Sequence, residues 1–187
     1  SVPADADVFN VSAATADSEI NWVNAGTALT LNTSASAGTY YIYKKWTADS
    51  NHSNSSTYTQ VGTLNRSKAT PTLTLNNTNA TFHNTAKITA TASVAGTIYW
   101  GTSSTSMTNT KTVSAKTAVD LTTRTTLGDT TVYAYFVPTD TTNYNSLGSS
   151  SSAHTSKTMS VTKANDANVS VTLDSAGAYG SVATLVT

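Results

Sequence analysis

The stretch TTVYAYFVPTDTTNYN, residues 130–145, is the clearest copy of a pattern that recurs along this chain. Its first half alternates in character and ends at Pro138, which predicts a strand that runs into a polar turn. A second and less regular copy, TYYIYKKWTADSNHSN, occupies residues 39–54. When the two copies are overlaid, most of the chain falls into register as a tandem repeat.

The repeat has an offset that grows along the chain. The matching segments are TALTL (27–31) with TAVDL (117–121), Gly38 with Gly128, and Lys68-Ala69 with Lys163-Ala164. The first two matches lie at 128 − 38 = 90 residues and the third at 163 − 68 = 95. Such drift is expected because surface loops gain and lose residues more readily than strands do. We therefore predict three segments: a shortened unit at 1–68, a complete unit at 69–163, and the opening strands of a third at 164–187.

The complete unit contains short stretches of alternating apolar and polar residues, of which 87–93, 97–100 and 130–137 are the clearest. Residues 111–121 fit either one bent strand or two short ones. About seven strands with a turn every eight to twelve residues indicate a β-sandwich, and roughly 95 residues is the size of an immunoglobulin-like one. The shortened unit should contain strands at 8–12, 19–23, 27–31, 39–46 and 56–64. The expected fold class is all-β, as tandem immunoglobulin-like β-sandwiches.

Four segments together resemble a known family: KATPTLTL, SVAGTIYW, YFVPTDTTNYN and KTMSVTKA. The order of these segments, and the succession of turns and strands within them, is similar to that in bacterial immunoglobulin-like repeats of long surface and adhesin-like proteins. The resemblance is good across 69–164 and weaker across 19–68. It implies an extracellular tandem sandwich that serves as a stalk or an adhesive module. The chain departs from the family pattern at Trp46, which no proline follows, and at Lys44.

Composition disfavours several classes of function. Charged residues make up 11% of the chain, with ten basic and ten acidic side chains and a net charge of zero, so no basic face is available for nucleic acid. No apolar run approaches the roughly 20 residues that a membrane-spanning helix needs. The chain has no cysteine and a single glutamate, Glu19, and it lacks a G-x-S-x-G motif. We therefore expect no enzyme and no cofactor.

Metal binding is also not expected. The three histidines, His52, His83 and His154, are far apart in sequence and lack the spacing of metal ligands. Acidic groupings near the start of the chain and at Asp166 and Asp174 could hold Ca²⁺ at a domain junction, but their spacing fits no known loop signature.

Aromatic residues are the remaining candidates for a binding site. Alternation that buries Val132, Ala134 and Phe136 turns the intervening tyrosines outward. The set of outward tyrosines expected on neighbouring strands is Tyr41, Tyr43, Tyr99, Tyr133 and Tyr135. Such a row could bind a glycan or a protein partner, or it could be ordinary cross-strand aromatic pairing. Likewise Trp22 and Trp100 are either exposed platforms for sugar rings or, as we expect, core residues.

The C-terminal segment carries two predicted strands, at 169–173 and 181–187. Two strands alone do not make a stable domain, and their edges invite pairing with another chain. The apolar residues expected to mediate this assembly are Val169, Val171, Leu173, Val182 and Leu185. The expected function is thus an extracellular structural module of a microbial cell surface, a stalk, fibre or filament subunit that self-associates head-to-tail by strand addition. The alternative is an adhesin-type module that binds glycan or host protein through the tyrosines.

Overall fold

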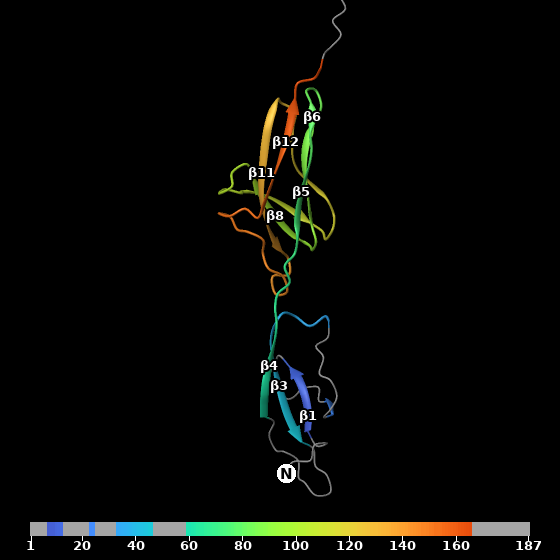
Figure 1. Ribbon diagram of the computed structural model, residues 1–187, viewed down its shortest axis with the longest axis vertical. Coiled ribbons are helices and arrows are strands. Elements are labelled where there is room, and N and C mark those ends of the chain that lie inside the picture. The colour runs from blue at the N-terminus through green and yellow to red at the C-terminus, as the bar shows by residue number, and fades with distance from the viewer. Residues whose placement is uncertain (1–6, 13–22, 25–32, 47–58, 166–187) are drawn as a thin grey trace, which may run out of the picture.

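The computed structural model describes residues 7–12, 23–24, 33–46 and 59–165, with side chains for 33–44 and 59–165. Every regular element among these residues is a β-strand, so the all-β prediction is confirmed. The strands form two bodies that lie end to end, which we call the N-terminal unit and the C-terminal unit (Figure 1). The connection between them runs from Arg66 to Ala69.

The N-terminal unit contains one four-stranded antiparallel sheet in the order β2-β1-β3-β4. Its strands are β1 (Asp7–Ser12), β2 (Val23–Asn24), β3 (Gly38–Trp46) and β4 (Thr59–Arg66). The strands expected at 8–12 and 39–46 are therefore present, and the one expected at 56–64 begins at Thr59. The strand expected at 27–31, and most of the one at 19–23, lie outside the described residues.

The C-terminal unit contains two sheets, of three and five strands, in the orders β10-β7-β5 and β6-β12-β11-β8-β9. Its strands are β5 (Leu73–Thr78), β6 (Ala80–Thr81), β7 (Ala86–Ala92), β8 (Gly96–Gly101), β9 (Asn109–Val113), β10 (Val119–Arg124), β11 (Gly128–Pro138) and β12 (Thr155–Thr162). The stretch 111–121 is thus two strands rather than one, and they belong to different sheets. The chain turns between them at Lys116, whose φ is 58°.

The core of the C-terminal unit lies between its two sheets. Along β7 every second residue is buried, as the period of a strand with one inward face requires. The largest completely buried side chains come from both sheets and are Phe136, Ile88, Ile98, Met159, Val113 and Val132. Trp100 was expected in this core, but it packs against the core from the margin and is only half-buried. Trp22 lies outside the described residues.

The Phe136 ring explains why a glycine begins β8. Phe136 lies on β11 beside β8, where Pro138 pairs with Gly96. A Cβ at Gly96 would fall 2.4 Å from the Val137 carbonyl oxygen and 2.6 Å from the Phe136 ring. Only glycine leaves room for this close approach, so the placement of the buried Phe136 ring depends on the small residue at position 96.

The β3–β4 and β11–β12 hairpins share one register. Gly38 pairs with Arg66 at the start of the first hairpin, and Gly128 pairs with Val161 at the start of the second. The differences are 128 − 38 = 90 and 161 − 66 = 95, the same two offsets that relate the sequence segments. Both glycines have a positive φ, 154° and 107°. The residues from Gly38 to Ile42 therefore correspond directly to those from Gly128 to Val132, and a register shift after Ile42 in the β3–β4 hairpin ends the match.

Candidate functional site

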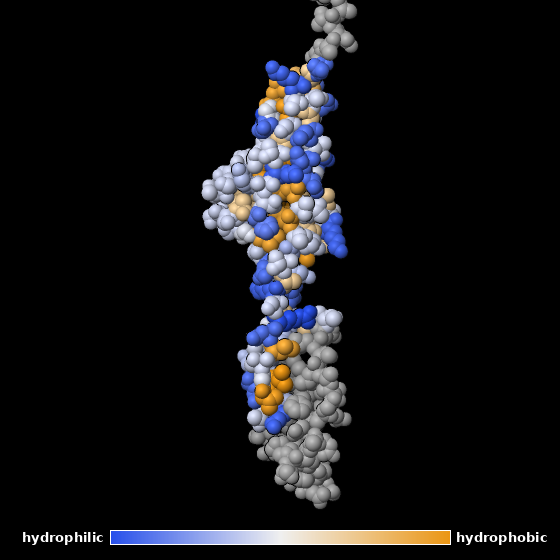
Figure 2. All heavy atoms as spheres, in the orientation of Figure 1, coloured by the Kyte–Doolittle hydropathy of each residue, from blue (hydrophilic) through white to orange (hydrophobic). Residues whose placement is uncertain are grey.

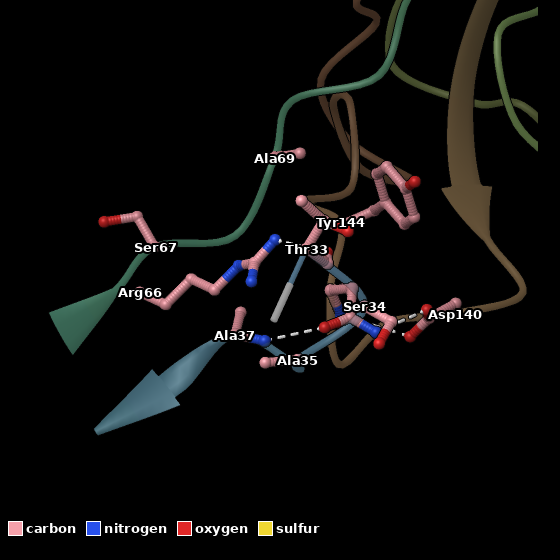
Figure 3. A pocket seen from close by; sticks show the side chains of 10 residues that line it. Thr33, Ser34, Ala35, Ala37, Arg66, Ser67, Ala69, Asp140 and Tyr144 are labelled. Carbon is pink, nitrogen blue, oxygen red and sulfur yellow. Dashed lines mark hydrogen bonds between the residues drawn. The ribbon is translucent and has the colours of Figure 1, made fainter. Parts of the chain in front are cut away.

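The turn that follows β11, residues 139–145, lies at the junction between the two units (Figure 1). It contacts the connection at 68–70 and the loop at 33–37 that precedes β3 in the N-terminal unit. Figure 3 shows these three segments converging from different elements on one small region. The junction is therefore built mainly by one polar turn of the C-terminal unit.

Asp140 organises this turn. Its Oδ1 accepts hydrogen bonds from the backbone N–H groups of Thr142 and Asn143, at 3.1 Å each. Its Oδ2 accepts a bond from the Asn143 side-chain Nδ2 at 2.7 Å. Aspartate commonly closes turns in this way, because its short side chain reaches backbone donors two and three residues ahead.

The same contacts lower the pKa of the Asp140 carboxyl group. The bond from the Asn143 side chain is the largest cause, followed by that from the Asn143 backbone, with smaller contributions from Thr142 and the charge of Lys68. Hydrogen bonds to a carboxylate favour its charged form. The ionised aspartate is therefore the form that the turn stabilises.

Asn143 connects the turn to the N-terminal unit. Because its Nδ2 donates to Asp140, its Oδ1 is left to accept a hydrogen bond, and it does so from the Ala37 backbone N–H at 2.7 Å. This bond is partly buried and joins residues 106 positions apart in the chain. Asp140 thus positions the amide, and the amide binds the neighbouring unit (Figure 3).

The connection between the units is held by the same turn. The Ala69 N–H donates to the Asn143 carbonyl at 2.8 Å, and the Asn145 N–H donates to the Ala69 carbonyl at 2.9 Å. These bonds form an isolated parallel bridge between Ala69 and Tyr144. The Lys68 ammonium group donates to the Thr141 carbonyl at 2.6 Å. The connection is therefore anchored rather than free to swivel.

A cavity of 340 Å³ lies within the junction (Figure 3). Arg66 crosses it and donates from Nη2 to the Thr33 carbonyl at 2.7 Å, which ties the end of β4 to the loop before β3. Asp140 and Asn143 line the opposite side. Groups of both units therefore line this cavity, where Arg66 bonds within the N-terminal unit and Asn143 bonds across the junction.

The predicted tyrosine set is divided between the units and is only partly exposed. Tyr41 and Tyr43 belong to β3, whereas Tyr99, Tyr133 and Tyr135 belong to β8 and β11. Tyr43 and Tyr135 are buried, with 6% and 8% of their surface exposed, so their expected outward exposure is not observed. The other three are half-buried.

Tyr135 is covered because a loop passes over it. Leu147 pairs with Phe136, and Gly148, at a φ of 77°, carries the loop so close that a Cβ there would lie 2.8 Å from that of Tyr135. On its other side Tyr135 stacks on Tyr99, with ring centroids 4.6 Å apart and planes inclined by 4°. Burial, and secondly the charge of Tyr99, raises the pKa of the Tyr135 hydroxyl. This pair is a cross-strand aromatic contact.

The other candidates form no second site within the part of the chain that the structure describes. The apolar residues expected to mediate assembly, Val169 to Leu185, lie outside the described residues. Within the described ranges, no three histidine, cysteine or acidic side chains come together to hold a metal ion. Those ranges also contain no helix long and apolar enough to cross a membrane.

The sequence pattern predicts the polar turn after Pro138 but not the contacts that Asp140 and Asn143 make. The signal that could have shown them is the Asp-x-x-Asn spacing, which leaves one amide oxygen for a partner outside the turn.

Comparison with protein-family models, with curated proteins and with solved structures finds no match for this chain.

Proposed function

We propose that this chain is a structural module of a microbial cell surface, a tandem immunoglobulin-like segment of a stalk, fibre or filament. The observation that carries this proposal is the junction, where Asn143 binds Ala37 and the turn at 139–145 anchors the connection. Two domains on a free linker move independently by default. Hydrogen bonds to both the loop and the connection instead favour a fixed angle between the units, as a load-bearing or spacing element needs.

The immunoglobulin-like part of the proposal rests on the C-terminal unit. Two sheets of three and five strands that enclose one core fit a sandwich of the expected size. The equal register of the β3–β4 and β11–β12 hairpins supports a repeat of such units along the chain. The extracellular location rests on two features of the sequence. Four of its segments resemble bacterial immunoglobulin-like repeats of surface proteins, and its composition is rich in serine and threonine and poor in charged residues.

Self-association by strand addition rests on β4. This strand is the edge of the four-stranded sheet, and its Val61 and Leu64 side chains are exposed. An exposed edge with apolar side chains is a template for a further strand. The donor we propose is the C-terminal segment of another copy. Deleting residues 165–187 should abolish polymers in negative-stain images, and unchanged polymers would refute this mode of assembly.

Binding of glycan or protein through the tyrosines is the less favoured function. Two of the five tyrosines are buried, and Tyr99 stacks on Tyr135 rather than presenting an open ring. A sugar platform requires an accessible aromatic face. The observed arrangement fits cross-strand pairing better.

The fixed junction can be tested in solution with residual dipolar couplings on the full chain. Amides of β3 and β4 report the orientation of the N-terminal unit, and amides of β8 and β11 report that of the C-terminal unit. If the junction is rigid, both sets should fit one alignment tensor. Two tensors of clearly different magnitude would show independent motion and would overturn the structural proposal.

A further inference from the structure

Asparagines of this chain often begin an Asn-x-Ser/Thr motif, as eight of the sixteen do. This motif is the acceptor signal for N-linked glycosylation, in which a sugar is attached to the side-chain nitrogen Nδ2 of the asparagine. The structure describes the side chains of three such asparagines, Asn65, Asn76 and Asn79, and all three are exposed. Their hydrogen bonds therefore show which nitrogens are available for attachment.

The three motif asparagines leave Nδ2 without an acceptor in the described part of the chain. Asn65 and Asn79 use only their amide oxygens, which accept bonds from the Thr39 hydroxyl at 2.9 Å and the Ser160 N–H at 3.0 Å. The other asparagines between residues 65 and 145 lie outside any motif, and every one of them donates from Nδ2: Asn77, Asn84, Asn109, Asn143 and Asn145. The open nitrogens thus coincide with the motif.

The motif at Asn76 is the most open of the three. Neither the Asn76 amide nor the hydroxyl of Thr78, the last residue of its motif, makes a hydrogen bond to any described residue. In the motif at Asn79, by contrast, the Thr81 hydroxyl accepts a bond from Asn84 Nδ2 at 3.1 Å. A sugar on Asn76 would therefore break no native hydrogen bond.

The motif at Asn65 is part of the junction instead. Its middle residue, Arg66, donates to the Thr33 carbonyl and lines the junction cavity. We infer that Asn76 is a site of N-linked glycosylation.

The position of Asn76 in the sheet supports this inference. Asn76 lies on β5, an edge strand of the three-stranded sheet, and points away from the face that buries Leu73 and Leu75. Figure 2 shows hydrophilic atoms at the upper end of β5, beside β6. Asparagine is depleted in strands, and this one stabilises no contact that would explain it. A glycan here would also shield the edge of β5 from pairing with another chain.

The modification needs a co-substrate, an oligosaccharide linked through pyrophosphate to a membrane lipid. Nδ2 of Asn76 forms a bond to C1 of the first sugar, and the bond from C1 to the pyrophosphate oxygen breaks. The lipid pyrophosphate leaves with that electron pair, and the amide gives one of its two protons to a base of the transferase. The inference rests on the extracellular location in the proposed function, because such transferases act on exported chains.

The test is mass spectrometry of the full chain purified from the organism that makes it. Trypsin releases residues 69–87 as one peptide, which contains Asn76 and Asn79 together with Asn77 and Asn84, which lie outside any motif. Electron-transfer fragmentation leaves sugars on their side chains, so it identifies the modified residue. We expect a glycan on Asn76 and none on Asn77 or Asn84.

Two variants made in the same organism show whether the motif directs the transfer. Thr78→Val removes the hydroxyl but keeps the size and branching of the side chain, and it should abolish the glycan on Asn76. Thr74→Val is the matched control, since Thr74 is also exposed on this face of β5, and it should keep the glycan. Equal melting temperatures of the two variants, both without glycan, would exclude misfolding as the cause.

An unmodified Asn76 in the natural chain would overturn the inference, and this result requires no variant to fold. A glycan confined to Asn79, or one that persists on Asn76 in Thr78→Val, would overturn it as well. Each of these results leaves the proposed structural function standing. That function fails separately, if the natural chain shows two alignment tensors.

Discussion

Replacing Asn143 with alanine isolates the contact that joins the two units. The substitution removes the Oδ1 acceptor of the Ala37 N–H at 2.7 Å and the Nδ2 donor to Asp140 at 2.7 Å. It keeps the backbone bonds of residue 143 to Ala69 and Asp140, which do not depend on the side chain. The connection should stay in place while the loop at 33–37 is released.

The stability that Asn143→Ala removes from this contact depends on how exposed the two bonded groups are. A protein hydrogen bond contributes about 0.5–1.5 kcal/mol net, and more is lost only where a group is left buried without a partner. The Ala37 bond is partly buried, so its N–H can return to water. Losing ~0.5–1.5 kcal/mol of stability at this contact raises the equilibrium constant for its local opening roughly two- to tenfold.

Native-state amide exchange by NMR measures this opening directly. The protection of the Ala37 amide should fall two- to tenfold, while the amides of Ile98 and Phe136 in the core keep theirs. Asn145→Ala is the matched control. Its side chain makes only a 3.4 Å contact with the Thr70 hydroxyl, and its backbone bond to Ala69 survives the change.

Equal protection of the Ala37 amide in the two variants would refute the reasoning. It would mean that the Asn143 side chain does not hold the N-terminal unit in solution. A loss of protection throughout the core would show instead that the asparagine is needed for the C-terminal unit to fold.

Three further predictions concern acid, the core and metal. The pKa of Asp140 is lowered from its ordinary value of 3.8, so the contribution of this carboxylate to stability is present above pH 3.8 and is lost as the pH falls through the lowered pKa. A titration of the Asp140 carboxyl group by NMR should give the lowered pKa, and an ordinary pKa would contradict the prediction. Phe136→Ala should destabilise the chain by about 3–5 kcal/mol in urea unfolding, and half-buried Trp100→Ala by less, so an equal or reversed order would contradict the packing. EDTA should leave the melting temperature unchanged, and a decrease that Ca²⁺ reverses would reveal a metal site.

In the C-terminal unit, the inward faces of the clearest strands follow from the local sequence pattern alone. Alternation along 87–93 and 130–137 predicts that Ile88, Val132 and Phe136 point inward, and all three are completely buried. The offsets of 90 and 95 residues, visible in the sequence, recur in the pairing of two hairpins. These features are local, because the pleat of a strand fixes the direction of each side chain relative to its neighbours.

What covers each face of a sheet, and what each turn contacts, depends on the tertiary structure. Tyr135 does point away from the core, as alternation predicts, yet the loop through Gly148 and the ring of Tyr99 bury it. Residues 109–113 and 119–124 belong to different sheets, although the sequence at 111–121 fits one bent strand as well as two short ones. The Asn143 side chain binds Ala37, which lies 106 residues away. Such contacts depend on chain segments far apart in sequence, and a pattern with a period of two residues carries no information about them.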